Sequence, residues 1–393
     1  MWQKNVLYLD YNASSGLDDS VRERLIQFLN DPDGLTANPS SSHRAGQRQR
    51  RILTEALKRI AQSLGPGVTE NDLVVTSSGT EANQTVLWSF SRSGFGIIVG
   101  AGEHSASYDV IPELKLAYPN LWIEECPISS DGTYDMNALA NLLNRAAIQG
   151  VKQVGVSLFW VNNETGVMTD LDALRNCLAS SPIKTSLHLD GAQVWGKMVF
   201  SVQETPASFV TFSSHKIGAP AGNGLIWKRG DTPLHPLLKG SQASGYRGGT
   251  ENLLGIIGMR FACEVMNPEA FSNETLPLRI KLEEGLKKKF PRVKIWGDSV
   301  SRISNTTRFG FSEFSSGQNW VELLDLKGFA VSHGSACKSK VIEPSRLLLK
   351  MGATRAEALN SIRVSFGRAT DPDAVERFLS ALNEVYDQKG STH

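Results

Sequence analysis

Short apolar runs recur along the chain up to Arg229, and polar or glycine-containing stretches separate them. Several of these runs have the length of a β-strand and are apolar at consecutive positions: "DLVVTS", "GIIVGAG", "QVGVSLFWV", "TSLHLD", "SFVTFS" and "NGLIWKR". Consecutive apolar positions are typical of strands that are buried on both faces. Helical patterns such as "DLDALRNCLAS" lie between several of the runs. The pattern therefore predicts a mostly parallel α/β sheet that is covered by helices.

The pattern changes after about Asn252. The stretches "LLGIIGMRFACEVM" and "LRIKLEEGLKKKF" have helical periodicity, and short strand-like pieces follow them. Near the C-terminus, apolar residues at helical spacing predict one buried helix face, made of Val375, Phe378, Leu379, Leu382, Val385 and Tyr386. We predict a large domain over residues 15–255, and a smaller α/β domain formed by residues 1–14 and 256–393.

Composition and charge narrow the classes of function. The chain has 393 residues, 40% of them hydrophobic, which is enough to bury a large core. A net charge of +1 gives no basic bias, so no nucleic-acid partner is expected. The first residues, "MWQKNVLYLD", lack the pattern of a signal peptide, and no apolar run reaches the ~18 residues that a membrane span needs. We expect a cytoplasmic protein with no membrane partner.

Four cysteines are scattered along the sequence, and none belongs to a C-x-x-C pair. This spacing predicts neither a zinc site nor any other metal site. Cys177 and Cys263 lie in apolar helical patterns, so both are predicted to be buried, as small hydrophobic residues usually are. Cys337 lies in "SHGSACKSK", where small and polar residues show no apolar periodicity. Taken alone, this stretch favours a free surface thiol over a catalytic one.

Ligands of open α/β sheets bind beyond the carboxyl ends of the strands, so the residues that follow each predicted strand are candidates for a site. After "DLVVTS" comes "SGTEANQ", where Ser78 and Glu81 have the spacing of a capping box. Gly79 and Thr80 then begin a helix whose free N–H groups suit a phosphate, although an ordinary capped helix has the same pattern. After "TSLHLD", Asp190 is either a helix cap or a carboxylate that pairs with a buried cation.

A third strand end carries a lysine. "SFVTF" is followed by "SSHKIGAP", which places Lys216 behind Ser213 and His215. A lysine in this position is either a solvated surface charge or a lysine that forms a Schiff base with a cofactor. A phosphate cradle, an Asp and a Lys at successive strand ends are together the parts of a pyridoxal phosphate site.

At this point the sequence resembles the cysteine desulfurases of the NifS/IscS type, which belong to the class-V aminotransferases. The resemblance runs from about Leu7 to Arg368 and rests on motifs in the family's order. These motifs are "YLDYNAS", "NPSSSHRAG", "TSSGTEANQ", "GEHSA", "VNNETG", "LDGAQ", "SSHKIGAP", "YRGGTEN", "GSAC" and "SIRVSFGR". The resemblance implies pyridoxal phosphate as cofactor and the aspartate-aminotransferase fold, with a large domain built on a mostly parallel seven-stranded sheet.

The resemblance also implies a role for each matching residue. The implied catalytic residues are Lys216 as the Schiff-base lysine, His104 stacked on the cofactor ring, and Cys337 as the nucleophile. Asp190 would pair with the ring nitrogen and Gln193 with the ring hydroxyl. The implied cofactor-binding residues are Gly79, Thr80, His104, Asn163, Asp190, Gln193, Ser213, His215, Lys216 and Thr250, the last reaching the neighbouring subunit of a homodimer. The implied substrate-binding residues are Asn38, Asn163 and Arg363, with Arg363 as the carboxylate clamp.

The implied reaction converts L-cysteine to L-alanine and leaves the sulfur on Cys337 as a persulfide. A protein acceptor, either an iron–sulfur scaffold or a thiolation protein, would then receive it. The sequence departs from the family pattern at His333 and Lys338 in the cysteine loop, at Ala243, and in "GAPAGNG". The alternatives are a selenocysteine lyase, a cystine or cysteine C–S lyase or an aminotransferase on the same fold, and more remotely a non-catalytic binding protein.

Overall fold

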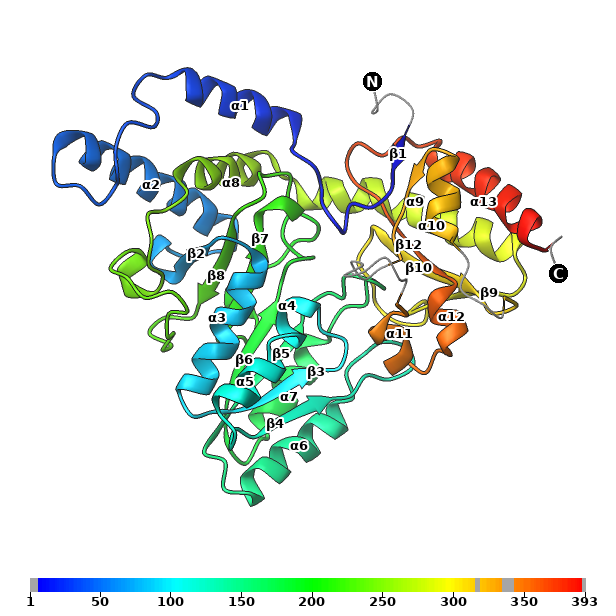
Figure 1. Cartoon of the computed structure of the whole chain (residues 1–393), viewed down its shortest axis with the longest axis horizontal. Helices are drawn as coiled ribbons and strands as arrows, with labels where there is room; N and C mark the ends of the chain where they lie inside the picture. Colours follow the sequence, from blue (N-terminus) through cyan, green and yellow to red (C-terminus); the bar gives the residue numbers. More distant parts are fainter. Residues whose placement is uncertain (1–5, 315–318, 334–342, 391–393) are drawn as a thin grey trace.

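The computed structural model describes residues 6–314, 319–333 and 343–390 of the chain (Figure 1). Its largest feature is a seven-stranded sheet with the order β2-β8-β7-β6-β5-β3-β4. Strands β3 to β7 run parallel to one another, and β8 is antiparallel to both of its neighbours. The bounds are β2 Leu73–Thr76, β3 Gly96–Gly100, β4 Ile123–Cys126, β5 Gln153–Phe159, β6 Lys184–Asp190, β7 Phe209–Ser213 and β8 Gly224–Lys228. The predicted mostly parallel sheet is confirmed.

Helices cover both faces of this sheet. One buried cluster joins one face to side chains of α1, α2, α6, α7 and α8, whereas a second joins the opposite face to α3 and α5. The bounds are α1 Asp19–Asn30, α2 Arg44–Gln62, α3 Gly79–Arg92, α4 Ser105–Tyr108, α5 Ile111–Ala117, α6 Met136–Ile148, α7 Leu171–Ala179 and α8 Leu253–Val265. Within the part of the chain that the structure describes, no helix is long and apolar enough to span a membrane.

The second part of the molecule lies on the right of Figure 1 and has its own hydrophobic cluster. Its antiparallel sheet has the order β12-β10-β9, and a parallel pair joins β1 to β11. The bounds are β1 Leu7–Tyr8, α9 Pro268–Lys289, β9 Val293–Ile295, β10 Thr306–Phe311, α10 Trp320–Leu326, β11 Phe329–Ala330, α11 Arg346–Lys350, α12 Arg355–Leu359, β12 Ser361–Ser365 and α13 Ala374–Gly390. The predicted apolar face of the C-terminal helix packs on this cluster.

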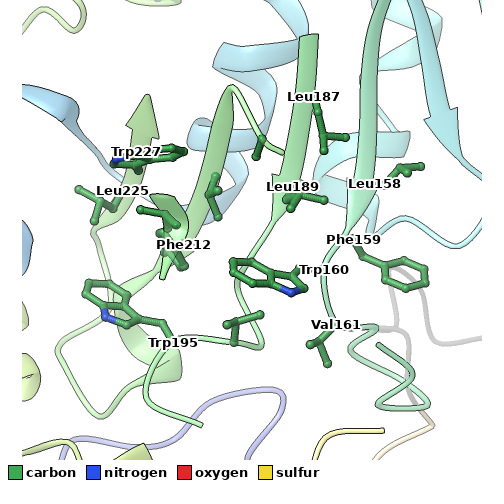
Figure 2. Packing of buried hydrophobic residues seen from close by; sticks show 14 of the residues in the cluster. Leu158, Phe159, Trp160, Val161, Leu187, Leu189, Trp195, Phe212, Leu225 and Trp227 are labelled. Carbon is green, nitrogen blue, oxygen red and sulfur yellow. The ribbon is translucent and has the colours of Figure 1, made fainter. Parts of the chain in front are cut away.

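The core of the large sheet shows why its strands are apolar at consecutive positions. Alternate residues of β5 to β8, such as Leu158, Leu189 and Phe212, pack in the first cluster together with Trp195 and Trp227 (Figure 2). The residues between them face α3 on the other side. Burying a large apolar side chain contributes about 1.5–3 kcal/mol relative to leaving it exposed, so this packing fixes the positions of the strand ends.

Two details of the fold differ from what the sequence predicts. The edge strand β4 is absent from the predicted runs because Glu124 and Glu125 interrupt its apolar pattern. The boundary predicted at residue 255 falls inside α8, whose buried side chains pack in the core of the large sheet. The domain division stays a prediction, and we would place its second boundary after α8.

Candidate active site

A cavity of about 550 Å³ lies beyond the carboxyl ends of β5, β6 and β7. Three parts of the chain that are distant in sequence close it: the N-terminal residues 10–13, the start of α3, and Ser332 with Arg363, which form an isolated bridge in the small part of the molecule. Most of the predicted site residues line this cavity, namely Gly79, Thr80, His104, Asn163, Asp190, Gln193, Ser213, His215, Lys216 and Arg363. The fold therefore brings together residues whose grouping the sequence could only imply.

Lys216 follows β7 and extends its amine toward the N-terminal segment. Its Nζ atom donates hydrogen bonds to the carbonyl oxygens of Asn12, at 2.5 Å, and Ala13, at 2.9 Å. Burial, followed by the nearby charge of Arg363, lowers the pKa of the Lys216 amine from 10.5 to about 8. A substantial fraction of this amine is therefore neutral near pH 8, which is the form that attacks a carbonyl group.

Asp190 ends β6, and its carboxylate is held by two donors. The side-chain Nδ2 of Asn83 donates to Oδ2 at 2.7 Å, and the backbone N–H of Ala192 donates to Oδ1 at 2.9 Å. Sequence reasoning missed Asn83. A signal was available, because Asn83 lies four residues after Gly79 and therefore on the same face of α3.

The start of α3 forms one wall of the cavity. Ser78 caps the helix by accepting from the N–H of Glu81 at 3.1 Å, as predicted. In a capping box the Glu81 carboxylate would accept from the N–H of the cap residue, Ser78. Here it accepts instead from the N–H of Ser77 at 2.7 Å. A Cβ atom added at Gly79 would lie 3.1 Å from the Cβ of Ser213, so a side chain there would crowd the hydroxyl groups on this wall.

This donor set fits pyridoxal phosphate. The N–H groups that open α3 at Gly79 and Thr80 suit a phosphate dianion, as do the hydroxyls of Thr80 and Ser213. Burial lowers the pKa of His215 to about 4, so its imidazole is neutral and donates one N–H. Asp190, which also lines the cavity, supplies the carboxylate that a protonated pyridine nitrogen requires. The residues present match both ends of the cofactor.

His104 caps α4 with its side chain. Its Nδ1 accepts from the N–H of Ala106 at 3.1 Å. Burial lowers the pKa of the imidazole, so the ring is neutral and carries its single hydrogen on Nε2. The ring lines the cavity, where Nε2 can act as a donor.

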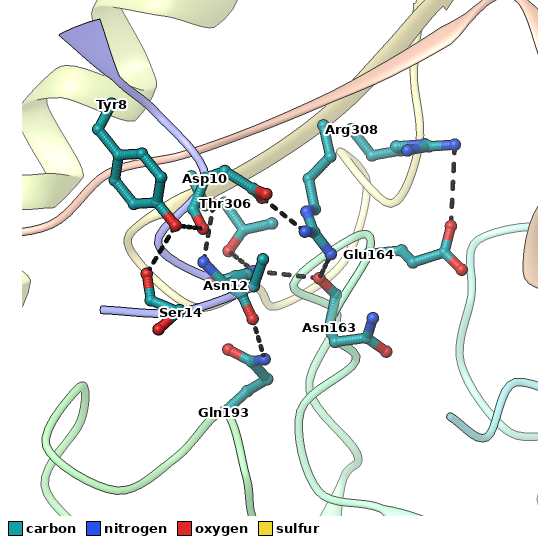
Figure 3. A network of polar contacts seen from close by, with 12 residues as sticks. Tyr8, Asp10, Asn12, Ser14, Asn163, Glu164, Gln193, Thr306 and Arg308 are labelled. Atoms are coloured by element: carbon teal, nitrogen blue, oxygen red, sulfur yellow. Dashed lines mark hydrogen bonds and ion pairs between the residues drawn. The ribbon is translucent and has the colours of Figure 1, made fainter. Parts of the chain in front are cut away.

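Asn12 joins the two parts of the molecule at the cavity, because its side-chain nitrogen donates to Thr306 Oγ1 of β10 at 2.8 Å (Figure 3). Its carbonyl oxygen accepts from Gln193 Nε2 at 3.1 Å, and its side-chain nitrogen donates to the carbonyl of Asn163 at 3.1 Å. The buried Lys197 donates to Asn12 Oδ1 at 2.8 Å and to Gln193 Oε1 at 2.5 Å. Lys197 thus fixes the orientation of the Gln193 amide with its nitrogen toward Asn12. Sequence reasoning missed both Asn12 and Lys197.

Arg363 lies in β12 and is almost fully buried. Its Nη2 pairs with Asp10 Oδ1 at 2.6 Å, and its Nη1 donates to the carbonyl of Asn163 at 3.0 Å. These contacts hold the guanidinium at the cavity wall in a fixed orientation. A bound carboxylate would share the guanidinium with Asp10, a partner that the sequence did not suggest.

Among the predicted site residues that the structure describes, two do not line the cavity. Asn38 and Thr250 lie beside each other, with Asn38 Nδ2 at 3.4 Å from Thr250 Oγ1. Thr250 lines a different cavity of about 790 Å³. That cavity shares Gly222 and Asn223 with the first, but neither Asn38 nor Thr250 is among the residues that line the cavity of Lys216 and Asp190.

The cysteines fall into two groups. Cys337 and its neighbour Lys338 lie outside the described residues. Cys126 is fully buried, whereas Cys177 and Cys263 are only partly buried and pack against the core. Burial raises the pKa of all three thiols, to about 12 for Cys126 and Cys263. These thiols are therefore protonated near neutral pH.

Glu103, the residue before His104, is a buried acid that does not line the cavity. Its Oε1 accepts from the hydroxyl of Tyr134 and from the N–H of Phe159, both at 2.5 Å. Burial raises the pKa of Glu103 from 4.5 to about 8, although both hydrogen bonds oppose the shift. The carboxyl group is therefore protonated at neutral pH.

This protonation predicts a pH-dependent stability. Between pH 4.5 and 8 the folded state holds a proton on Glu103 that the unfolded state has lost, so the contribution of Glu103 to stability falls as the pH rises through that window. His188 and His215, whose pKa values burial lowers from 6.5 to about 4, contribute with the opposite sign below pH 6.5. The expected slope is about 1.4 kcal/mol per pH unit at its steepest. In denaturant unfolding between pH 5 and 8, the stability of the wild type minus that of Glu103→Gln should fall as the pH rises, whereas the same difference for the exposed control Glu113→Gln should stay constant. An unchanged slope in Glu103→Gln would contradict the assignment.

The family described as "Aminotransferase class-V" matches residues 7–378 of the chain. Among curated proteins, a cysteine desulfurase of Cereibacter sphaeroides is 32% identical over 387 residues, covering 97% of this chain and 96% of that protein. The cysteine desulfurase NifS of Azotobacter vinelandii is 29% identical and covers 97% of this chain and 93% of its own length.

A solved structure extends the match to three dimensions. The X-ray structure of a NifS-like protein from Rickettsia africae superposes with a TM-score of 0.85 at 28% identity, and the match covers 97% of this chain and 99% of that one. The fold expected from the sequence motifs is thereby confirmed. The match of the family over nearly the whole chain, on this fold, shows that the protein belongs to the class-V aminotransferases.

Proposed function

We propose that the protein is a pyridoxal phosphate-dependent cysteine desulfurase that converts L-cysteine to L-alanine and retains the sulfur on Cys337. The observation that carries the proposal is the convergence of Lys216, Asp190 and Arg363 on one cavity. A lysine, a carboxylate and an arginine are the groups needed to attach the cofactor, to charge its ring and to hold an amino acid. The names of the relatives favour cysteine as that amino acid.

Several residues that line the cavity have their own roles in the proposed reaction. Pyridoxal phosphate, when bound, supplies an electron sink for the substrate's α-carbon. Arg363 binds the substrate carboxylate, and the neutral amine of Lys216 removes the α-proton and returns a proton. Asp190 keeps a positive charge on the ring nitrogen. The Nε2–H of His104 faces the same cavity as a hydrogen-bond donor.

The sulfur step requires a thiolate. The Cys337 thiolate attacks the substrate sulfur, an S–S bond forms, and the C–S bond breaks with its electrons returning to the substrate carbon, which takes up a proton. Cysteine and the enzyme thiol thus become alanine and an enzyme persulfide, with no outside oxidant. The raised pKa values of Cys126, Cys177 and Cys263 make those thiols poor candidates for this step.

The proposal includes partners. A homodimer would bring Thr250 and Asn38 of one chain to the site of the other, which is consistent with their absence from the lining of the Lys216 cavity within one chain. The persulfide would pass to a protein acceptor in the cytoplasm, either an iron–sulfur scaffold or a thiolation protein.

The test is a parallel assay of the cofactor-loaded protein with cysteine, selenocysteine and cystine. The proposal expects alanine from cysteine, with sulfide released by a thiol reductant. Turnover confined to selenocysteine would favour a selenocysteine lyase, and turnover confined to cystine would favour a C–S lyase. Failure to bind pyridoxal phosphate, seen as the absence of its visible absorption, would leave only the binding-protein alternative.

Arg363→Ala tests the carboxylate clamp. Loss of a buried charged partner typically costs about 2 kcal/mol or more, so the KM for cysteine should rise about 30-fold. Cofactor affinity should persist, because no predicted phosphate or ring contact involves Arg363. Steady-state kinetics and cofactor titration measure the two effects separately. A KM equal to that of the wild type would place the clamp elsewhere.

A further inference from the structure

Three polar residues interrupt the apolar face of the large sheet that packs on α3. Ser157 on β5, His188 on β6 and Thr211 on β7 are all less than 2% exposed. Ser157 lies directly opposite His188 in the strand register, and Thr211 lies directly opposite Asp190. Their neighbours in sequence, such as Leu187 and Val210, face the opposite hydrophobic cluster. Three fully buried polar side chains in an apolar layer require partners.

They find these partners in one another and in α3. Ser157 Oγ lies 2.9 Å from His188 Nδ1, and His188 Nε2 lies 3.0 Å from Thr211 Oγ1. The Thr211 hydroxyl donates to Asn83 Oδ1, and Asn83 Nδ2 donates to Asp190 Oδ2 at 2.7 Å. An unbroken row of hydrogen bonds therefore runs from β5 across the sheet to the carboxylate in the cavity.

The direction of every bond in this row follows from its end at Asp190. The carboxylate accepts, so Asn83 must present its nitrogen there and its oxygen to Thr211. Thr211 has a single hydroxyl hydrogen, which this oxygen takes, so Thr211 can only accept from His188.

His188 must then carry its hydrogen on Nε2. Burial lowers the pKa of His188 to about 4, so at neutral pH the ring has only that one hydrogen. Its Nδ1 therefore accepts from the Ser157 hydroxyl. In each of the four hydrogen bonds of the row, the donor is therefore the group farther along the row from Asp190.

We propose that Asn83, Thr211 and His188 are positioning residues that deliver an aligned hydrogen-bond donor to Asp190 and hold its carboxylate in the ionised form that pairs with the pyridine nitrogen. This inference rests on the proposed function. A hydrogen bond to the charged form of a carboxylate favours that form, and aligned bonds in a low-dielectric interior strengthen one another. With pyridoxal phosphate bound, loss of the row would weaken Asp190 as the partner of a protonated ring nitrogen, and the ring would be a weaker electron sink.

Thr211→Val tests this in the cofactor-loaded protein, because valine keeps the branched shape and removes only the hydroxyl. With pyridoxal phosphate labelled with ¹⁵N at the ring, the ring-nitrogen resonance should move toward the unprotonated position. The kcat for cysteine should fall about tenfold with little change in KM, as about 1.4 kcal/mol added to the barrier would produce. Thr211→Ser, which restores a hydroxyl, should recover both values.

Thr85→Val is the matched control. Thr85 is also a buried threonine, but its hydroxyl donates to the Glu81 carbonyl within α3 and not to the row. In Thr85→Val, the ring-nitrogen resonance of the bound cofactor and the kcat for cysteine should equal those of the wild type. If Thr211→Val does not fold, Ser157→Ala at the far end should shift the resonance in the same direction by a smaller amount.

An unshifted resonance in Thr211→Val, or in Ser157→Ala where that variant stands in, would overturn the inference. A fall in kcat in Thr211→Ser as large as that in Thr211→Val would overturn it as well. If the wild type itself shows no bound cofactor signal, the proposed function fails instead. The two failures are therefore distinguishable.

Discussion

Lys216→Ala should lower alanine formation from cysteine by at least about 10²–10⁴-fold, the range that positioned acid–base groups usually contribute. The variant loses both the amine that attaches the cofactor and the base at the α-carbon. In the structure this amine is held by two backbone carbonyls and its pKa is lowered to about 8. Alanine release from cysteine measures the effect. The exposed Lys184→Ala, at the far end of β6, should behave as the wild type.

The attachment itself can be mapped. Borohydride reduction of the cofactor-loaded protein, followed by peptide mapping, should place the pyridoxyl group on Lys216. The nearest rival is Lys197, whose pKa burial also lowers and whose amine lies in the same network around Asn12. Labelling of Lys197, or an unimpaired Lys216→Ala, would contradict the assignment.

Cys337→Ala should reduce alanine formation close to background while leaving cofactor binding and the spectral response to cysteine intact. Cleavage of the C–S bond needs a thiolate to accept the sulfur, whereas the earlier steps use only groups that line the cavity. Cys337→Ser should fail as well, because a hydroxyl is a far poorer nucleophile than a partly ionised thiol. Mass spectrometry of the wild type after mixing with cysteine should find one added sulfur, about 32 Da, at Cys337.

The other cysteines supply the controls. Alanine substitutions at Cys126, Cys177 and Cys263 should leave persulfide formation intact, since burial raises the pKa of each of these thiols. Substantial alanine formation by Cys337→Ala would refute the desulfurase step. It would instead favour a lyase in which sulfur leaves without attack by the enzyme.

The sequence by itself determined the sheet and the identity of most candidate site residues. Strands buried on both faces must be apolar at consecutive positions, and Asp190 ends one such strand and Lys216 lies in the turn that follows another. Their placement at one edge then follows from the parallel order of the sheet. The pattern failed at β4, because an edge strand tolerates the charges of Glu124 and Glu125.

Only the tertiary structure decided how these residues are held. Asn12 contacts Lys216, and Asp10 contacts Arg363, across more than two hundred residues of sequence. The row from Ser157 to Asp190 crosses three strands and a helix, and each of its members alone is an ordinary polar residue in an apolar run. Periodicity reports which face a residue occupies, but hydrogen-bond partners depend on strand register and on helix packing. Those two features are set by the whole core, which is why the supports of the site, unlike its principal residues, have no local signal.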